Sequence, residues 1–303
     1  MRSRWGATHI RTREIAIIAA IVMLALMLSE SSASAQVGKR NFYDPLITED
    51  PNPSNEIELD PGWVKETGKS AAAFSFSIEK QLSDTIGIEV GDAINDLSKR
   101  RLHSSTGIDN VEVLATWAFY TNVEHEFRVA LGFDTFIPTG DVDSGAESHA
   151  RGGPMLMFAR GLGDLPDRDY FRFVRPFAIQ SDLDYLPAWS GDESQLVEFN
   201  IALSYSTYYL TDSAIHLPFE QYSKNLVPFT EFNYQQVAFG KTTTPPDWRI
   251  TPGLAYLTQY YELAIATQLA LNNAASSQDH SAVLVQLSIY YDQIWPVTGT
   301  QLF

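Results

Sequence analysis

The sequence predicts an all-β fold: a single antiparallel, up-and-down transmembrane β-barrel of about 12 strands. Three observations lead to this prediction. Apolar and polar residues alternate with a period of two along most of the chain after residue 54. The residues opposite the apolar face are mostly small, mainly Ala, Ser, Gly and Asn. Beyond the N-terminal region no apolar run is long enough for a membrane helix, and a barrel strand needs an apolar surface only on its lipid-facing side.

Residues 1–35 have the organisation of a cleaved signal peptide. Four arginines precede a run of 14 apolar residues, 15–28, and Ala33-Ser34-Ala35 supplies the small-x-small pattern read by signal peptidase. An uncleaved anchor helix is the alternative, but a helix that crosses a bilayer needs about 20 apolar residues. We therefore expect cleavage before Gln36 and export to the outer membrane of a Gram-negative bacterium.

The charge of the chain excludes one class of partner. The sequence has 37 acidic and 21 basic residues, giving a formal net charge of −16. Loss of the signal removes four Arg and two Glu, which moves the charge to about −18. Nucleic acid is therefore not an expected partner, since its phosphates require a basic surface. The chain has no Cys, so disulfides do not stabilise it.

The exported part divides into three regions. Residues 36–54 have low hydrophobicity and contain three prolines, which is typical of an extended periplasmic leader or a short plug. Residues 55–292 carry the alternation and form the predicted barrel, and residues 293–303 form a C-terminal tail. The predicted strands are 55–64, 70–81, 84–92, 108–119, 124–137, 151–161, 170–184, 194–209, 225–240, 248–258, 260–271 and 281–292.

The polar faces of these strands indicate which side meets lipid. In the segment 197–205 every second residue is apolar, and the residues between are Glu, Asn, Ala and Ser. Solvated strand faces in soluble proteins carry more Lys and Glu, yet only Lys224 and Lys241 occur after residue 101. We therefore expect apolar residues such as Leu203 to face lipid and small residues such as Ser204 to face the lumen. A soluble periplasmic β-barrel that binds a ligand is the alternative.

Charged residues within the predicted strands are expected to point into the lumen, because an Arg facing lipid at the bilayer midplane costs about 2–4 kcal/mol. Two interpretations remain open for them. The arginines pair with glutamates in an ionic cluster that braces the barrel, or the charged side chains line a permeation path and act as a filter. The candidates are Arg128, Arg172, Glu112, Glu198, Glu262 and Asp134. In the bracing interpretation Arg128 and Arg172 pair with Glu112 and Glu198.

Other candidate sites are weaker. Asp141, Asp143 and Glu147 lie close together in one loop and offer oxygen ligands to a cation such as Ca²⁺. The full EF-hand pattern is absent, so a solvated acidic loop is the simpler interpretation. The sequence has no nucleophile elbow or phosphate-binding loop, and its histidines are not at metal-ligand spacing. Ser148 and His149 are adjacent, and on a strand they would point to opposite faces. We expect no enzyme, cofactor or structural metal.

Several motifs, in order along the chain, resemble an outer-membrane family. Asp44 to Pro51 is similar to the family's "PFxTEDP" opening, and Phe136 to Asp141 resembles its "slPtGd" turn. Thr251 to Tyr256 resembles its "PGiqY" strand, and Asp292 to Phe303 is similar to its ending after the last strand. The family groups barrels of the MetA-pathway-of-phenol-degradation, or transporter-like, type.

The resemblance implies an outer-membrane barrel that passively admits small solutes, with hydrophobic or aromatic compounds proposed for part of the family. It also implies three kinds of partner: outer-membrane lipid and lipopolysaccharide, the barrel-assembly machinery, and a small solute of unknown identity. A structural or interaction barrel with a closed lumen is the competing hypothesis. One departure from a usual barrel is that Phe303 does not end the last predicted strand, so the strand-terminal aromatic assembly signal is not cleanly placed.

Overall fold

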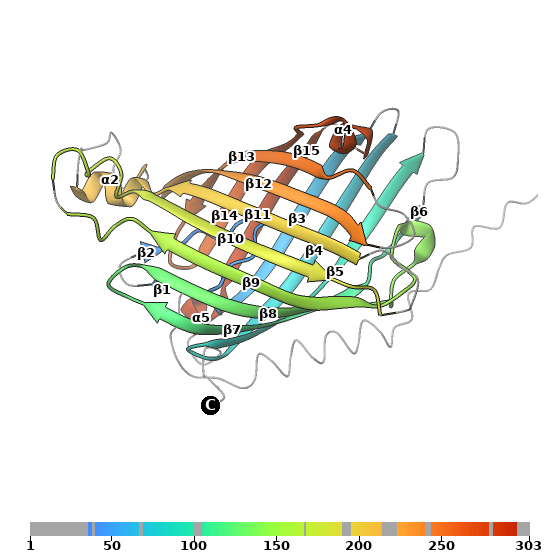
Figure 1. Ribbon diagram of the computed structural model, residues 1–303, viewed down its shortest axis with the longest axis horizontal. Helices are drawn as coiled ribbons and strands as arrows, with labels where there is room; N and C mark the ends of the chain where they lie inside the picture. Colours follow the sequence, from blue (N-terminus) through green and yellow to red (C-terminus); the bar gives the residue numbers. More distant parts are fainter. Residues whose placement is uncertain are drawn as a thin grey trace, which may run out of the picture.

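The computed structural model describes residues 36–37, 40–66, 69–99, 105–166, 168–189, 195–213, 223–239, 244–278 and 281–295. The predicted signal peptide and the last eight residues of the predicted tail lie outside the described residues. The main sheet is a closed antiparallel barrel of twelve strands, to which one short strand, β6 (Ser105–Ile108), is added (Figure 1). The barrel strands are β3 (Asn55–Glu66), β4 (Lys69–Ser83), β5 (Ile86–Lys99), β7 (Val111–Asn122), β8 (Phe127–Ile137), β9 (Arg151–Gly161), β10 (Phe177–Leu186), β11 (Gln195–Tyr205), β12 (Leu226–Phe239), β13 (Asp247–Leu257), β14 (Tyr261–Ala270) and β15 (Ser281–Tyr290).

The barrel closes where the last strand meets the first. β15 pairs antiparallel with β3, in a register that places Tyr290 opposite Glu56 and Ser281 opposite Lys65. Every other barrel strand pairs with its neighbours in the chain, except that β6 intervenes between β5 and β7 in sequence. β6 pairs with the later part of β5, whereas β7 pairs with the earlier part, from Ile86 to Gly91. Closure satisfies the backbone groups that an open edge would leave exposed in lipid.

The predicted strands and the observed strands agree closely. Each predicted segment overlaps one barrel strand, and β9 has the predicted bounds. The largest differences are at β5, which was predicted to end at residue 92 and continues to Lys99, and at β10, which was predicted from residue 170 and begins at Phe177. Residues 168–176 instead form consecutive turns, in which Phe171 N donates to Arg168 O and Val174 N donates to Phe171 O. Local hydrogen bonds therefore replace strand pairing in this segment.

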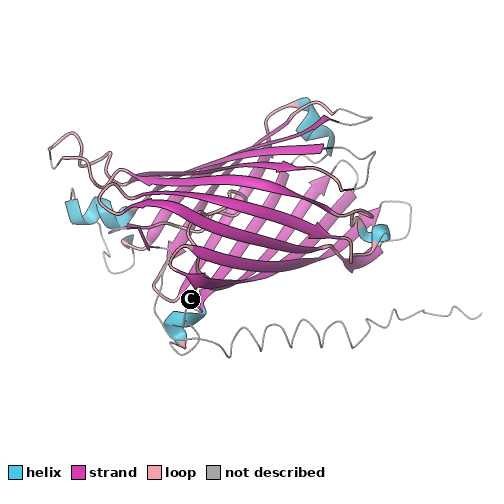
Figure 2. Cartoon of the chain, turned by 60° about the horizontal axis from the view of Figure 1, so that its bottom comes forward, coloured by secondary structure: helices cyan, strands magenta, loops and turns pink. Residues whose placement is uncertain are grey.

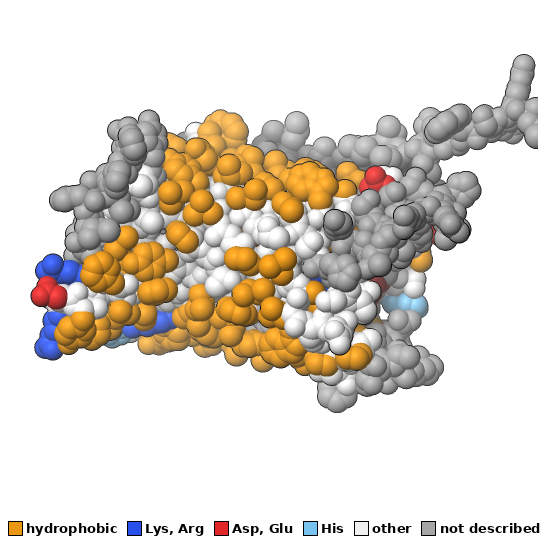
Figure 3. Space-filling view, turned by 90° about the horizontal axis from the view of Figure 1, so that it is seen from above, with side chains coloured by type: hydrophobic (Ala, Val, Ile, Leu, Met, Phe, Trp, Pro, Cys, Tyr) orange, Lys and Arg blue, Asp and Glu red, His pale blue; other side chains and the backbone are white. Residues whose placement is uncertain are grey.

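The two faces of the wall differ as the alternation predicts. On β14, the side chains of Leu263 and Ile265 are 47% and 54% exposed, whereas Ala264 and Ala266 between them are buried. Leu203 is likewise exposed and Ser204 buried. Figure 3 shows hydrophobic side chains over the middle of the visible outer face, with charged groups toward the two ends. An apolar exterior on a closed β-barrel places the chain in the outer membrane of a Gram-negative bacterium.

Long connections between strands occur at both ends of the barrel, with 138–150 at the end opposite Asn55 and Tyr290. We call the end with Asn55 and Tyr290 the terminal end and the opposite end the distal end. Short helices lie among the connections: α2 (Thr207–Ser213), α4 (Asn273–Gln278), α5 (Tyr291–Ile294) and the 3₁₀ helix η1 (Val142–Ser144) (Figure 2). The terminal end has short turns at 84–85, 123–126 and 258–260, but also the long connections 162–176 and 206–225. Long loops therefore occur at both ends, not at one alone.

None of the helices in the described ranges is long and apolar enough to span a bilayer. The residues before the barrel begin with two short paired strands, β1 (Gln36–Val37) and β2 (Arg40–Asn41). From β2 the chain continues inside the barrel before it joins β3 (Figure 1). We call residues 40–54 the leader segment.

Candidate functional site

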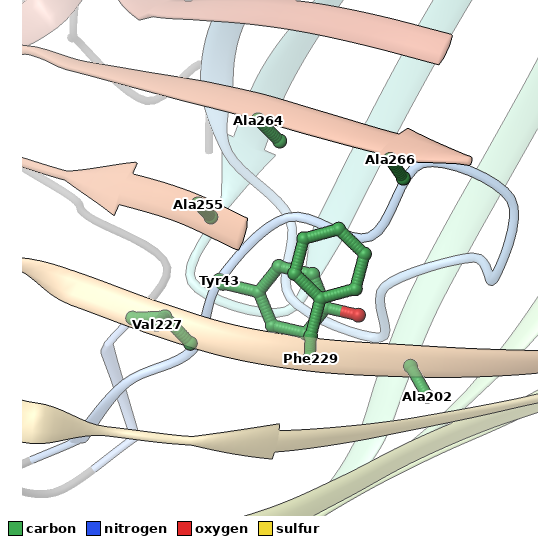
Figure 4. Close-up of a cluster of buried hydrophobic side chains, with 7 residues drawn as sticks. All are labelled: Tyr43, Ala202, Val227, Phe229, Ala255, Ala264 and Ala266. Carbon is green, nitrogen blue, oxygen red and sulfur yellow. The ribbon is translucent and has the colours of Figure 1, made fainter. Parts of the chain in front are cut away.

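The leader segment packs against the inner face of the barrel wall. The ring of Tyr43 stacks on that of Phe229 from β12, with centroids 4.7 Å apart (Figure 4). Small side chains surround this pair, among them Ala202, Ala255 and Ala264, each 0% exposed. Alanines at these inward positions leave the room that an aromatic side chain from the leader fills. The small inward residues predicted from the alternation thus have a packing partner.

Glu231 on β12 accepts four hydrogen bonds from the leader. Its carboxylate accepts hydrogen bonds from the backbone N–H groups of Leu46 (2.9 Å), Ile47 (3.1 Å) and Thr48 (2.9 Å). It also accepts one from the Thr48 hydroxyl at 2.9 Å. The Glu231 side chain is fully buried. Successive backbone N–H groups directed at one carboxylate form a concave anion-binding surface, so this contact fixes the course of the leader inside the barrel.

Further contacts tie the leader to other parts of the wall. The backbone N–H of Asp44 donates to Glu262 on β14 at 3.1 Å, and that of Glu49 donates to Asp182 on β10 at 2.9 Å. Near the end of the leader, the backbone N–H of Ser54 donates to Glu79 on β4 at 3.0 Å. Because β4, β10, β12 and β14 are spread around the barrel, the leader crosses the lumen and does not follow one wall.

Arg40 holds the start of the leader at the terminal end. Its Nε donates to Glu126 at 2.9 Å, and its other nitrogens donate to the backbone oxygens of Pro176 and Arg175. The guanidinium carbon lies 4.3 Å from the ring centroid of Tyr209, whose hydroxyl also donates to Glu126. Arg40 is 2% exposed, so removal of either partner of this ion pair would leave the other as an unpaired buried charge and destabilise the fold.

An acidic cavity of about 540 Å³ lies between the leader and the loops of the distal end. Among the described residues, eight aspartates and eight glutamates contribute to its lining, whereas Arg151 is the single Lys or Arg there. Arg151 is itself neutralised, because it donates to Glu147 through Nε and Nη2, both at 3.0 Å. The cavity lining is therefore strongly acidic in composition. Within the leader, burial and then the nearby charge of Asp44 raise the pKa of Asp50 to about 8.

The structure places five of the six predicted lumen residues on the inner side of the barrel, in three groups. Glu112, Asp134 and Glu198 lie on the cavity lining, and Glu198 accepts a hydrogen bond from Gln235. Glu262 lies deeper, against the leader. Arg128 is on the inward face of β8 at the terminal end and donates to Thr121 at 3.1 Å.

The prediction for Arg172 is wrong. Arg172 lies in the connection before β10, and it pairs with Asp169 at 3.7 Å at the barrel's end. Its position follows from the local turns of residues 168–176. In the described residues no ion pair joins Arg128 to Glu112 or Arg172 to Glu198, so the predicted bracing cluster does not form there. The buried ion pair that does join distant segments is that of Arg40 with Glu126.

Both weaker loop candidates lie in the connection between β8 and β9. Asp141, Asp143 and Glu147 do not come together as a ligand group within the described residues. Asp141 instead accepts a hydrogen bond from the Asp143 backbone and caps η1. Ser148 and His149 are in a bend, outside the predicted strands, and Ser148 Oγ lies 2.8 Å from His149 Nδ1.

The sequence reasoning missed several inward carboxylates. Glu56 and Glu58 alternate with Ile57 and Leu59 on β3, and Asp182 and Asp184 alternate in the same way on β10. The same alternation that identified Glu198 also applies to these residues. Glu231 could be placed on an inward face by alternation, but its partner, the leader, lies more than 180 residues away in sequence.

Comparison with known proteins supports the fold. No family model and no curated protein matches the chain. Among solved structures, an outer-membrane channel from Pseudomonas putida F1 has a TM-score of 0.54 at 11% identity, covering 82% of this chain and 99% of that chain. The NanC porin (TM-score 0.48, 10% identity, 76% and 98% covered) and the KdgM porin (0.44, 13%, 77% and 98%) are also similar. At these identities the likeness concerns the fold, and the scores of the two porins are too low to carry an argument. The chain therefore has the barrel architecture seen in an outer-membrane channel.

Proposed function

We propose that the chain is a passive outer-membrane channel for small solutes, and that its lumen favours cationic, polar solutes. The observation that carries this proposal is the cavity lining, to which the described residues contribute sixteen acidic side chains (eight Asp and eight Glu) and one guanidinium. Rings of carboxylates in a pore attract cations and repel anions, and low-dielectric walls strengthen the effect. The barrel architecture supports a path along the lumen.

The acidic lining bears on the class of solute. The resemblance to the MetA-pathway type of barrel implies hydrophobic or aromatic solutes, and membership of that family remains a hypothesis. A hydrophobic solute in this cavity would displace water from carboxylates, and burying charge without a partner is costly. A cationic solute would instead supply the missing counter-charge. We therefore place cationic solutes ahead of hydrophobic ones.

We further propose that the leader segment acts as a plug. It crosses the lumen, and Glu231, Glu262 and Asp182 hold it by hydrogen bonds. Solutes that reach the cavity from the distal end would then pass only if the docked leader leaves part of the lumen open, or when the leader leaves its docked position. The same contacts favour the competing function, a structural barrel with a permanently closed lumen.

Liposome swelling distinguishes these functions. Purified protein in liposomes is exposed to lysine, glutamine or glutamate, which have similar size and different charge. The proposal predicts the fastest swelling with lysine and the slowest with glutamate. Equal rates would contradict the role of the acidic lining, and the absence of swelling with every solute would support the closed structural barrel.

A further inference from the structure

Three carboxylates meet where the leader passes the first barrel strand. Asp44 comes from the leader, and Glu56 and Glu58 come from the inward face of β3. One carboxylate oxygen from each of the three lies within 4.8 Å of the others. In the described part of the chain no Lys or Arg forms a salt bridge with any of them. Three carboxyl groups are thus gathered without a basic side chain paired to any of them in the described residues.

Two further side chains beside Asp44 leave buried oxygens without partners. Gln286, 3% exposed, donates from Nε2 to Asp44 Oδ2 at 2.9 Å, while its Oε1 has no hydrogen-bond partner. Glu262, 0% exposed, accepts from the Asp44 backbone through Oε2, and its Oε1 also has none. Within the trio, Glu56 Oε2 is a third such oxygen. Buried polar atoms without a partner are rare in folded proteins, and an ordered water or a bound ion is the usual explanation for them.

We infer that Asp44, Glu56 and Glu58 form a binding site for a divalent cation, for which Ca²⁺ is the best match. Ca²⁺ takes six to eight oxygen ligands in a flexible arrangement and accepts carboxylate and amide oxygens alike. Mg²⁺ requires a stricter octahedron and keeps several waters. Three carboxylates with the Gln286 amide oxygen close by supply the oxygen-rich set that Ca²⁺ prefers. All four residues also line the acidic cavity, which gives the ion a route to the site.

Such an ion would join two separate parts of the molecule. Asp44 belongs to the leader, whereas Glu56 and Glu58 belong to the wall. Binding would therefore fasten the leader to β3, and loss of the ion would leave three carboxyl groups facing one another across that contact. Calcium would thus stabilise the docked position of the leader.

Calorimetric titration tests the site. The full exported chain in detergent is freed of metal with EDTA, dialysed and titrated with CaCl₂. The variants are Glu56→Gln with Glu58→Gln together, Asp44→Asn alone, and Asp184→Asn as a matched control. Asp184 lines the same cavity from β10, six strands away around the twelve-stranded barrel. Heat modifiability on gels verifies that each barrel is folded, and Asp44→Asn, which leaves the wall unchanged, keeps the test valid if the double variant does not fold.

We expect the unchanged protein to bind about one Ca²⁺ per chain. The double variant should bind at least about 100-fold more weakly, Asp44→Asn should bind at least about 10-fold more weakly, and Asp184→Asn should stay within about twofold. No calcium binding by the unchanged protein would overturn the inference. So would an equal loss in Asp184→Asn, since binding would then reflect the acidity of the whole lumen. Titration needs no membrane current, so its failure is distinguishable from failure of the proposed channel.

Discussion

Glu231→Gln is predicted to release the leader segment from the barrel wall. Glu231 accepts four hydrogen bonds from residues 46–48, three from backbone N–H groups and one from a hydroxyl. Hydrogen bonds to a charged group each contribute about 1.5–3 kcal/mol, and bonds that share one partner are not additive. The amide removes the charge and turns one acceptor into a donor that faces other donors. We therefore expect a loss of about 4 kcal/mol in docking free energy, which corresponds to about a 10³-fold change in the docking equilibrium.

Thiol labelling measures this change, because the chain has no cysteine of its own. In an Ile47→Cys background and calcium-free buffer, the rate of reaction with a bulky maleimide reports the undocked fraction. Glu231→Gln should raise the rate at least about 100-fold, and Thr48→Val, which removes one of the four bonds, about fivefold, equivalent to about 1 kcal/mol. Asp184→Asn, which changes a lumen carboxylate with no hydrogen bond to the leader in the described residues, should leave the rate within about twofold. An unchanged rate in Glu231→Gln would show that the hydrogen bonds of Glu231 to residues 46–48 do not hold the leader in place.

Three further predictions concern the wall, the pH response and the ion. Leu203→Arg should block assembly, because Arg facing lipid costs about 2–4 kcal/mol, whereas Ser204→Arg should give a heat-modifiable barrel; equal damage from both would contradict the register. Raising the pH from 5 to 9 should accelerate labelling in the Ile47→Cys background, after correction for thiol ionisation. Burial and then the charge of Asp44 raise the pKa of Asp50 from 3.8 to about 8 in the docked leader, so Asp50 is protonated there at neutral pH. The free energy of docking therefore weakens as the pH rises from about 4 to about 8, and it levels off above pH 8. Asp50→Asn should flatten this response, and a response that persists would exclude Asp50 as its source. Chelation of calcium should also accelerate labelling, and Asp44→Asn should abolish that effect; chelation without consequence would contradict the role of the ion in docking.

The barrel itself could be predicted almost completely from local patterns. Period-two alternation predicts where each strand lies and which of its side chains face lipid or the lumen, because the backbone of a β-strand fixes the side-chain period at two. The prediction of a strand at 170–176 was wrong because the aromatic and apolar residues of this segment suit a strand, whereas its backbone forms its hydrogen bonds within turns. Arg172 was misplaced for the same reason.

The course of the leader could not be predicted in this way. Its low hydrophobicity and prolines indicate irregular structure, but not whether that structure lies inside or outside the wall. The answer depends on contacts between residues far apart in sequence, such as Tyr43 with Phe229 and Thr48 with Glu231. Alternation along β3 could have predicted that Glu58 points inward. The contact of Glu56 and Glu58 with Asp44 could not be predicted, because it requires both the closed barrel and the inserted leader.

The central claim is that the acidic lumen makes this barrel a cation-preferring channel. The most direct measurement is the zero-current potential of the protein in a planar bilayer under a tenfold KCl gradient, with Glu198→Gln, Arg128→Ala and the leader-releasing Glu231→Gln beside it. We predict a potential of the sign given by potassium selectivity, which Glu198→Gln reduces and Arg128→Ala increases. An anion-selective potential, or no current even from folded Glu231→Gln protein, would contradict the account.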